Sequence, residues 1–342
     1  MKLVRTEDAV GQVLCHDITQ IIPGVVKDAV FRKGHIVTKE DIPVLLSVGK
    51  ENLYIWEKQE GMLHENEAAE ILRQICQGEH MHPSEVKEGK IELIADCEGV
   101  LKINTEKLNA VNNLGEMMIA SRHGNFPVKT GDKIAGTRII PLVIEEEKMQ
   151  KACEVAGKEP IFRILPYQKK KAGIVTTGSE VYYHRIEDKF TPVVIEKLKE
   201  CGVTEVKQIQ CNDDHEMIME AIQTLIEDGS DLIVCTGGMS VDPDDRTPLA
   251  IKNACTEVVT YGAPVLPGAM FMLAYCEKEG RQIPVMGLPG CVMYAKRTIF
   301  DLVLPRIMCD EKLHEKDFRL LGQGGLCLSC PVCTFPNCGF GK

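Results

Sequence analysis

The stretch Ser230–Pro248, S-D-L-I-V-C-T-G-G-M-S-V-D-P-D-D-R-T-P, decides the fold of this chain. Its apolar run, Leu232 to Cys235, is short and bounded by polar residues, which is typical of a strand buried on both faces. The glycines that follow, at 237 and 238, let the backbone bend and leave amide N–H groups free to face an anion. Thr247–Pro248 then has the residue types of a helix start. A buried strand that ends in such a loop predicts a ligand-binding edge of a parallel sheet.

The same alternation continues on both sides of this stretch. The predicted strands are Ala172–Thr177, Val206–Ile209, Leu232–Cys235 and Ile283–Met286. The predicted helices run from Thr191 to Cys201, from the cap at Asn212–Asp214 to Gly229, from Thr247 to Cys255, and from Val292 to Leu304, where Pro305 ends the helix. Strands and helices of these lengths form βαβ units. We therefore predict an α/β fold with a mostly parallel sheet and helices on both faces.

Composition narrows the class of protein. The chain has 342 residues and a formal net charge of −10, which argues against nucleic acid as the main partner. No apolar run reaches the roughly 18 residues of a membrane span, and the N-terminus M-K-L-V-R-T-E-D is not a signal peptide. We expect a cytoplasmic protein with no membrane partner. Its fifteen cysteines are then more typical of thiols or metal ligands than of disulfides.

Four parts are predicted along the chain. Residues 1–58 form an N-terminal segment that packs on the core domain, and residues 59–166 form a small α+β insert, in which Leu108 to Ala120 is helical. Residues 167–312 form the α/β domain, and residues 313–342 form a cysteine-rich tail that binds metal. We expect a homo-oligomer, with a dimer favoured.

Three predicted strand ends meet at one edge of the sheet. They carry Thr177–Glu180, Thr236–Ser240 and Gly287–Gly290. Their backbone amides and hydroxyls suit a phosphate, with each neutral hydrogen bond contributing about 1 kcal/mol. The carboxylates Asp242, Asp244 and Asp245 would repel a phosphate unless Mg²⁺ neutralises them or they accept hydrogen bonds from an amino-pyrimidinone ring. The alternative is that the glycines make turns and the aspartates cap the next helix.

Residues 172–308 resemble the molybdopterin-binding domain shared by molybdopterin adenylyltransferases and molybdopterin molybdotransferases. The resemblance rests on motifs in a common order and spacing, which are Thr177–Glu180, Asp213–Asp214, Gly237–Val241, Asp245 with Thr247–Pro248, Pro267–Gly268 and Gly287–Gly290. Each motif alone is weak, and together they are specific. Residues 30–58 are similar to the short helix and strand that precede this domain in the molybdotransferases.

The resemblance implies that molybdopterin, or the molybdenum cofactor, binds across these loops with Mg²⁺. It implies functional carboxylates at Asp214 and Asp245, the catalytic candidates, although a helix cap is an equally good interpretation of Asp214. Glu180 is then a Mg²⁺ ligand or a pterin contact. The cofactor-binding candidates are Thr177, Gly178, Ser179, Glu180, Thr236, Gly237, Gly238, Met239, Ser240, Asp242, Pro267, Gly268, Leu288, Pro289 and Gly290.

The chain also departs from the molybdotransferase pattern. Those proteins carry lysines around the Pro-Gly turn, where this chain has Val265–Met270, and Asn-Pro after the last loop, where this chain has Cys291–Val292. Lysine is the natural partner of molybdate or pyrophosphate, so two positive charges are missing from the expected anion site. Lys296 and Arg297, on the predicted last helix, are a possible replacement, but a solvated helix face is the stronger interpretation. Binding is therefore better supported than metal insertion.

The tail carries Cys327, Cys330, Cys333 and Cys338 within twelve residues. Thiolates at this spacing complete a tetrahedral Zn²⁺ site or hold an iron–sulfur cluster. The tail has no apolar periodicity, so a metal would explain its order. The alternative is a flexible tail with free thiols.

These observations lead to three hypotheses on function. The first is a protein of molybdenum cofactor biosynthesis that binds molybdopterin and transfers molybdenum to it with Mg²⁺. The second is a non-catalytic carrier or sensor that delivers the cofactor to a molybdoenzyme, which the missing lysines favour. The third is molybdopterin adenylyl transfer, which Asp245–Pro248 supports.

Overall fold

The computed structural model describes residues 2–22, 26–55 and 60–342. The chain forms two compact units: the first is Met1–Asp96 with Ile103–Arg122 and Thr130–Arg163, and the second is Cys97–Lys102 with His123–Lys129 and Ile164–Lys342. The predicted four-part division stays a prediction, and its boundary at residues 58 and 59 lies outside the described residues.

The N-terminal part of the first unit is a small β-rich element around a compact apolar core. Its strands pair as β1 (Lys2–Arg5) with β4 (Asn52–Ile55), and as β2 (Ile18–Ile22) with β3 (Val26–Phe31). The 3-10 helix η1 (Thr6–Asp8) and the helix α1 (Asp41–Ser47) complete it. Its core residues are Ala9, Leu14, Ile18, Val37, Leu45 and Leu53.

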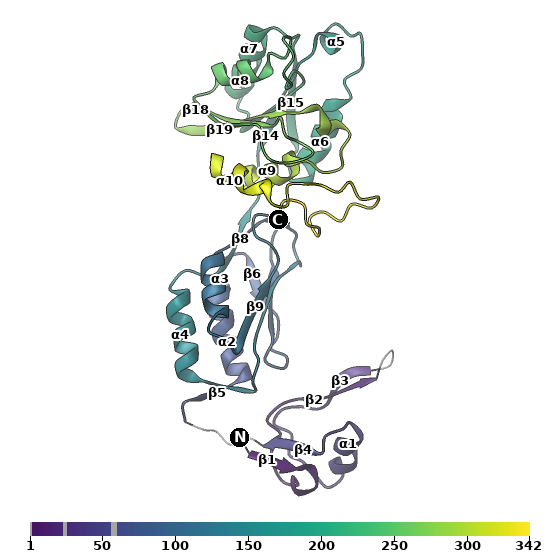
Figure 1. The fold of residues 1–342 in the computed structure, drawn as a ribbon, viewed down its shortest axis with the longest axis vertical. Helices are drawn as coiled ribbons and strands as arrows, with labels where there is room; N and C mark the ends of the chain where they lie inside the picture. The colour runs from purple at the N-terminus through teal and green to yellow at the C-terminus, as the bar shows by residue number, and fades with distance from the viewer. Residues whose placement is uncertain (1, 23–25, 56–59) are drawn as a thin grey trace. The chain divides into compact units, whose positions relative to one another are not determined.

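The rest of the first unit is an α+β layer structure, shown in Figure 1 with α2, α3 and α4 beside the strands β6 and β9. Its four-stranded sheet has the order β6 (Met81–Pro83), β7 (Ile91–Ala95), β11 (Lys133–Ile139) and β9 (Met117–Ser121), and a second pair joins β12 (Val143–Glu145) to β5 (Met62–His64). The helices are α2 (Glu65–Cys76), α3 (Thr105–Asn112) and α4 (Glu146–Ala156).

One predicted helix of this part is half wrong. The helix predicted for Leu108 to Ala120 ends at Asn112, and Met117–Ser121 is the strand β9. The chain turns at Gly115, whose φ of 72° lies in the left-handed region that ends a helix. The apolar residues beyond it then pair with β11, and this tertiary pairing overrides their helix propensity.

The second unit contains a six-stranded sheet of order β15-β14-β16-β19-β18-β17. The first four strands are parallel, and β18 runs antiparallel to both of its neighbours. The strands are β14 (Lys171–Thr176), β15 (Glu205–Gln210), β16 (Leu232–Thr236), β17 (Glu257–Tyr261), β18 (Met272–Lys278) and β19 (Arg281–Leu288). The predicted α/β fold with a mostly parallel sheet is confirmed.

Helices cover both faces of this sheet, because successive side chains of each strand point to opposite sides. Ile174, Val234 and Met286 lie in the core on the side of α6 (Phe190–Glu200) and α9 (Ile299–Met308). Val175, Cys235 and Val285 lie in the core on the side of α7 (His215–Glu227) and α8 (Thr247–Ala254). The strands β8 (Gly99–Ile103) and β13 (Phe162–Pro166) each have residues in both units. The remaining elements of the second unit are β10 (Pro127–Val128), α5 (Ser179–Tyr182), η2 (Gly290–Met293), α10 (Glu315–Arg319) and η3 (Leu320–Gly322).

The last predicted helix is shifted. The prediction placed it at Val292 to Leu304, whereas α9 begins at Ile299 and continues through Pro305 to Met308. Thr298 and Asp301 form a capping box that fixes this start, with the Phe300 amide donating to Thr298 Oγ1. Every residue of α9 is buried, so packing on both sides tolerates the hydrogen bond that Pro305 removes.

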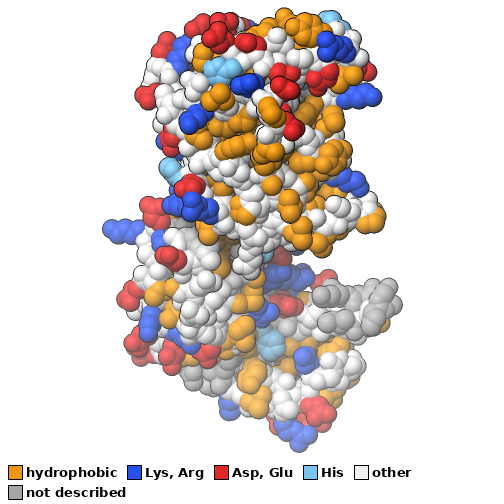
Figure 2. Space-filling view, turned by 45° about the horizontal axis from the view of Figure 1, so that its top comes forward, with side chains coloured by type: hydrophobic (Ala, Val, Ile, Leu, Met, Phe, Trp, Pro, Cys, Tyr) orange, Lys and Arg blue, Asp and Glu red, His pale blue; other side chains and the backbone are white. Residues whose placement is uncertain are grey.

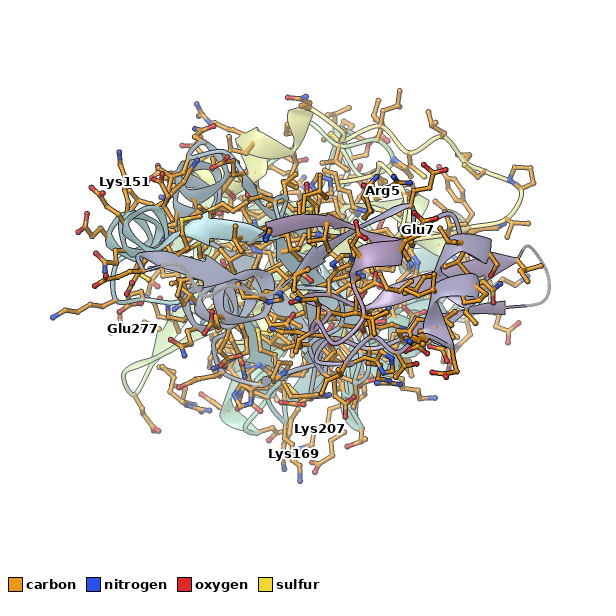
Figure 3. The ribbon with its side chains drawn as sticks, turned by 90° about the horizontal axis from the view of Figure 1, so that it is seen from below. Arg5, Glu7, Lys151, Lys169, Lys207 and Glu277 are labelled. Carbon is orange, nitrogen blue, oxygen red and sulfur yellow. The ribbon has the colours of Figure 1, made fainter. Side chains whose placement is uncertain are left out.

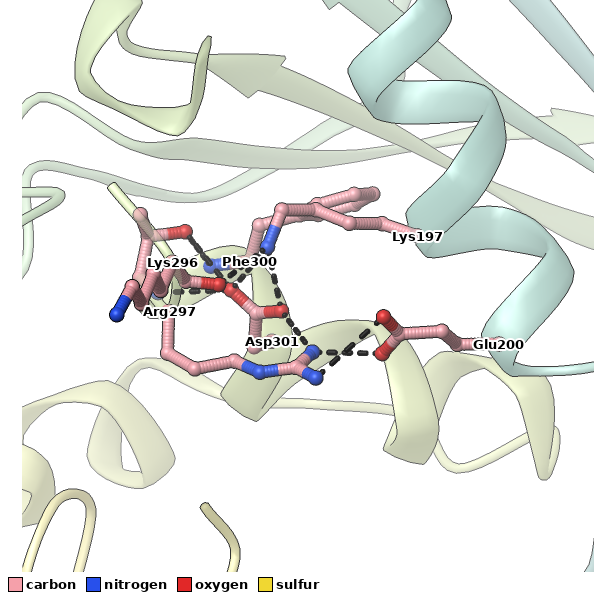
Figure 4. Close-up of polar contacts among 7 residues, drawn as sticks. Lys197, Glu200, Lys296, Arg297, Phe300 and Asp301 are labelled. Carbon is pink, nitrogen blue, oxygen red and sulfur yellow. Dashed lines mark hydrogen bonds and ion pairs between the residues drawn. The ribbon is translucent and has the colours of Figure 1, made fainter. Parts of the chain in front are cut away.

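A buried ion-pair network joins α9 to α6 (Figure 4). Lys197 Nζ donates to both carboxylate oxygens of Asp301, at 2.7 and 2.9 Å. Arg297 donates to Asp301 at 2.8 Å and to Glu200 at 2.6 Å. The side chains of Lys197 and Asp301 are only 8% and 3% exposed, so removing one partner would leave a buried charge without compensation.

Many other charged side chains lie in solvent. Lys169, Lys207 and Glu277 point away from the body of the chain in Figure 3, and on the face drawn in Figure 2 basic side chains lie among acidic ones. Within residues 2–22, 26–55 and 60–342, every helix is too short or too polar to cross a bilayer.

Candidate functional site

The loop after β14 is tied to the neighbouring loop by a carboxylate. The Ser179 amide, at the start of α5, donates to Asp213 Oδ2 at 2.8 Å. Gly178 has a φ of 129°, which favours glycine at this turn. Ser179 is half-buried and Glu180 is exposed. Asp213 therefore orients the first predicted binding loop from the loop that follows β15.

The loop after β16 packs so closely on Thr177 that only glycine fits. Gly237 and Gly238 have φ values of 88° and 55°. A Cβ atom on Gly237 would lie 2.4 Å from the Thr177 carbonyl oxygen, and one on Gly238 would lie 2.8 Å from Thr247 Oγ1. Thr177 Oγ1 in turn lies 3.1 Å from Thr247 Oγ1 and donates to the Thr236 carbonyl at 3.0 Å. We call Thr177, Gly237, Gly238 and Thr247 the threonine–glycine cradle.

Thr236 adds an unsatisfied polar atom beside this cradle. Its side chain is 1% exposed, and its Oγ1 has no hydrogen-bond partner among the described residues. A buried hydroxyl without a partner costs about 1–3 kcal/mol. The atom lies at the carboxyl end of a central parallel strand, the edge at which ligands of such sheets bind.

The carboxylates after the cradle form a turn that faces solvent. The Asp245 amide donates to the Asp242 carbonyl at 2.9 Å, and the Asp242 amide donates to Asp245 Oδ2 at 3.3 Å. Asp242 and Asp244 are exposed, as is Ser240, and Asp245 is half-buried. The carboxylates are therefore available to a ligand that reaches the loop.

Tyr261 is a residue of this site that the sequence did not reveal. Its hydroxyl donates to the Met239 carbonyl at 3.1 Å and so holds the loop after β16. Burial, followed by the negative charge of Asp245, raises the pKa of Tyr261, which keeps the phenol protonated as a donor. Tyr261 ends β17, an edge strand that no sequence pattern had predicted.

Asp214 acts in the structure as a helix cap. It is the N-cap residue of α7, and its Oδ1 accepts a hydrogen bond from the Met217 amide at 2.9 Å. Asp214 is exposed, and its neighbour Asp213 makes the contact to the Ser179 loop. The capping alternative that the sequence left open is thus observed, and a catalytic role for Asp214 stays a prediction.

Two predicted ligand contacts are core residues. Leu288 is fully buried, and Met239 is 4% exposed and packs on Gly287, where a Cβ atom would lie 2.5 Å from Met239 Cε. Gly290 differs, because a Cβ atom there would meet nothing within 4 Å. The side chains of Met239 and Leu288 therefore pack in the core under the loops and do not face a ligand. The space next to Gly290 is open.

The Pro267–Gly268 turn packs on the start of α9. The Ile299 amide donates to the Pro267 carbonyl at 3.2 Å, and a Cβ atom on Gly268 would lie 2.5 Å from Ile299 Cγ2. The nearby cations have protein partners: Lys296 Nζ donates to the Pro331 carbonyl at 2.7 Å, and Arg297 pairs with Glu200 and Asp301. Both residues lie in the segment before α9, where the prediction had placed them on the last helix.

The last part of the cysteine-rich tail, residues 323–342, makes backbone and aromatic contacts. The Leu266 amide donates to the Gly325 carbonyl, and the Cys327 amide donates to the Leu266 carbonyl, each at 2.8 Å. The rings of Phe335 and Phe340 lie 6.2 Å apart, and Phe340 is 4% exposed. These contacts hold the tail against the rest of the second unit.

The four predicted metal ligands are not gathered in this structure. Cys327 and Cys338 pack against the core of the second unit, whereas Cys330 and Cys333 are exposed. Across the described part of the chain, no three His, Cys, Asp or Glu side chains form a group that could hold a metal ion. The present arrangement therefore does not fit Zn²⁺ or an iron–sulfur cluster, nor a Mg²⁺ ion held by protein ligands alone.

Comparison with known proteins identifies two matching regions. Residues 173–308 match the family described as "Probable molybdopterin binding domain". Residues 3–57 match a family described as "Domain of unknown function (DUF8806)". The first match confirms the resemblance predicted for residues 172–308.

Two curated relatives are CinA-like proteins. That of Mycobacterium tuberculosis is 35% identical over 85 residues, covering 25% of this chain and 20% of the relative. That of Mycobacterium avium is 34% identical over 95 residues, covering 28% and 22%. The chain thus spans about a fifth of the length of the curated relatives it matches.

Two solved structures are also similar in part. The tungsten cofactor synthesizing protein MoaB from Pyrococcus furiosus has 23% sequence identity and a TM-score of 0.32, over 36% of this chain and 84% of that chain. The molybdopterin biosynthesis Mog protein from Mycobacterium ulcerans has 19% identity and a TM-score of 0.32, over 40% of this chain and 92% of that chain.

Proposed function

We propose that the second unit binds molybdopterin or the molybdenum cofactor at the carboxyl edge of its sheet, as part of molybdenum cofactor biosynthesis. The observation that carries the proposal is the threonine–glycine cradle, which lies within the matched residues 173–308. Its glycines bring the backbone of the loop after β16 against the end of β14. The unpartnered hydroxyl of Thr236 lies at the end of the same central strand.

The two kinds of polar group at this edge suit the two ends of such a ligand. Backbone amides of the loops around the cradle suit a phosphate as hydrogen-bond donors. The exposed carboxylates of Asp242 and Asp244 accept hydrogen bonds and suit the donor-rich edge of a pterin. A nucleotide alone would use only the phosphate-binding donors and not the carboxylates.

The charges near the Pro267–Gly268 turn favour holding the ligand over transferring metal to it. Lys296 and Arg297 are the cations that could replace the missing lysines, and each already has a protein partner. Attracting a molybdate or pyrophosphate there would require breaking these contacts. We therefore favour a carrier or sensor that delivers the cofactor to a molybdoenzyme, with molybdenum transfer as the second candidate and adenylyl transfer as the third.

Mg²⁺ would bind this chain only together with the ligand. Mg²⁺ is commonly held by one or two carboxylates together with phosphates and water, so Asp242 and Asp245 would suffice once a phosphate is present. Bound there, the ion would neutralise charge between the phosphate and the carboxylates. What the chain itself supplies is the turn that keeps the two aspartates together.

A binding measurement tests the common part of the proposal. Titrating molybdopterin into the full chain should give saturable binding, and Gly237→Val, which forces a side chain into the contact between this loop and the Thr177 carbonyl, should abolish it. The Glu277→Gln variant is a matched control, because Glu277 is exposed near the opposite end of β18. Absence of binding to the unaltered chain would refute the proposal.

A second assay separates holding from turnover. The chain is incubated with adenylated molybdopterin, molybdate and Mg²⁺, and AMP release is followed. Tight binding without AMP supports the carrier. Release of AMP that disappears in Asp245→Asn but persists in Glu277→Gln supports molybdenum transfer. Formation of the adenylated ligand from ATP and molybdopterin supports adenylyl transfer.

A further inference from the structure

Two cysteines on the α7–α8 side of the second unit lie in direct contact. Cys255 is the C-cap residue of α8, and Cys276 lies on β18. Their Sγ atoms are 2.6 Å apart, so the two sulfurs are in direct contact. Neither residue belongs to the motifs that suggest ligand binding or to the cysteine tail.

The backbone fixes both partners from two directions. The Cys255 amide donates to the Ile251 carbonyl at 3.1 Å, which closes the last turn of α8. The next residue, Thr256, donates its amide to the Tyr275 carbonyl at 3.0 Å and its hydroxyl to the same oxygen at 2.9 Å. The chain then continues into β17, which pairs antiparallel with β18. Helix and sheet thus hold the two cysteines next to each other.

Burial and hydrogen bonding set the two sulfurs apart from ordinary core thiols. Cys276 is 5% exposed and Cys255 is half-buried, so a small reagent can approach the pair from the Cys255 side. The hydrogen bond from the Cys255 thiol lowers the pKa of Cys276. By contrast, burial raises the pKa of the neighbouring core thiol Cys211 to about 11. The pair therefore combines closeness, access and an ionisable sulfur.

We propose that Cys255 and Cys276 are an oxidisable dithiol that closes to an intramolecular disulfide when the protein meets a small-molecule disulfide. One thiolate of the pair attacks a sulfur of the reagent, and a mixed disulfide forms as the first half of the reagent leaves as thiolate. The second thiol loses its proton and displaces the other half. The protein gives up two electrons and two protons, and the reagent is reduced to two thiols.

The position of the pair gives the disulfide a structural consequence. It would join the end of α8 covalently to β18, while the beginning of the same helix carries Thr247 of the threonine–glycine cradle. We expect the oxidised protein to unfold at a higher temperature than the reduced protein, because the bridge restricts the unfolded chain.

The sequence around the pair makes the experiment simple to interpret. Trypsin cleaves after Lys252 and after Lys278, and the peptide Asn253–Lys278 contains both cysteines and no other cysteine, lysine or arginine except its last residue. The folded full chain is equilibrated with oxidised and reduced glutathione, and free thiols are alkylated. The protein is then digested with trypsin, and the peptide masses are measured by mass spectrometry. We expect this peptide to carry no alkyl groups and to be two hydrogens lighter than its reduced form. In the folded chain this disulfide should form at a lower proportion of oxidised glutathione than in the urea-unfolded chain.

Variants decide whether the fold is responsible. Cys255→Ala and Cys276→Ala should each leave the remaining cysteine alkylated or linked to glutathione, while Cys211→Ala, in the same core, should leave the disulfide unchanged. Circular dichroism checks that each variant is folded. Two alkylated cysteines in the unaltered folded chain, or disulfide formation no easier than in urea, would overturn the proposal. Neither result depends on whether molybdopterin binds.

Discussion

The loops at the carboxyl edge of the sheet and the cysteine tail both carry short motifs, but the fold positions the two sets differently. The cradle residues come from the ends of β14 and β16 and the start of α8, and they meet within hydrogen-bonding distance, with Thr177 Oγ1 only 3.1 Å from Thr247 Oγ1. The four cysteines are close in sequence, yet two of them pack on the core and two are exposed. Parallel strands fix where their loops begin, whereas an irregular tail follows the aromatic contacts that hold it.

The largest expected effect comes from removing the aromatic anchor of the tail. Phe340→Ala empties a site that is 4% exposed, and should lower the free energy of unfolding by about 3–5 kcal/mol if the surroundings cannot collapse. Urea denaturation measures the loss, and limited proteolysis should then cut within residues 323–342. Leu328→Ala, at a side chain 78% exposed, is the control and should change stability by less than about 0.5 kcal/mol. A tail that stays resistant to protease in Phe340→Ala would show that something else holds it.

The next effect concerns the cradle. Gly237→Ala places a Cβ atom 2.4 Å from the Thr177 carbonyl at a left-handed φ, and should cost about 2–5 kcal/mol in overpacking and backbone strain. Gly290→Ala, at a position with open space and without a left-handed φ, should be nearly neutral in stability. Equal stability losses for the two variants would contradict the close approach seen at Gly237.

Thr236→Val should stabilise the protein while weakening ligand binding. The substitution replaces a buried hydroxyl that has no partner among the described residues by a methyl group of similar shape, with a gain of about 1 kcal/mol. Thr177→Val is the matched control, because its hydroxyl makes hydrogen bonds and its loss should destabilise. Thermal unfolding with and without molybdopterin gives both readouts. A loss of stability in Thr236→Val without ligand would show that the hydroxyl is satisfied in the protein alone.

A smaller effect separates the two interpretations of Asp214. Asp214→Ala removes the N-cap of α7 and should cost about 1 kcal/mol, whereas Asp214→Asn keeps the cap and should be close to neutral. If Asp214 serves only as a cap, Asn will bind molybdopterin as the unaltered protein does. Stable Asp214→Asn that no longer binds or turns over the ligand would assign the carboxylate a functional role.

The smallest effect is expected from chelation. Because phenylalanine packing and backbone hydrogen bonds order the tail, a chelator should leave the unfolding temperature unchanged. Anaerobic purification followed by metal analysis tests the sequence prediction directly. Iron or zinc above background, lost in Cys330→Ser together with stability, would show that the four cysteines rearrange around a metal.

The fold of the second unit could be predicted because its signals are local. Buried strands such as Leu232–Cys235 end in glycine, and each is followed by a helix with its own start and stop residues. The edge strand β17 and its neighbour β18 were missed, and with them Tyr261, because Glu257–Tyr261 and Met272–Lys278 have neither clear alternation nor helix signals around them. The end of α9 was misplaced because Pro305 was taken as a stop, and its start lies at the Thr298–Asp301 capping box rather than at Val292.

The sequence by itself determined the strand ends, their glycines and the carboxylates that follow, because these depend on backbone conformations that each residue type allows. Only the tertiary structure decided which groups remain available to a ligand. In the structure Asp213 accepts a hydrogen bond from the Ser179 amide, and Asp214 caps α7. Lys296 and Arg297 bind other groups of the protein. The tail cysteines lie apart in the structure, whereas Cys255 at the end of α8 and Cys276 on β18 are in contact. Contacts between distant residues depend on how elements pack, and no local pattern records them.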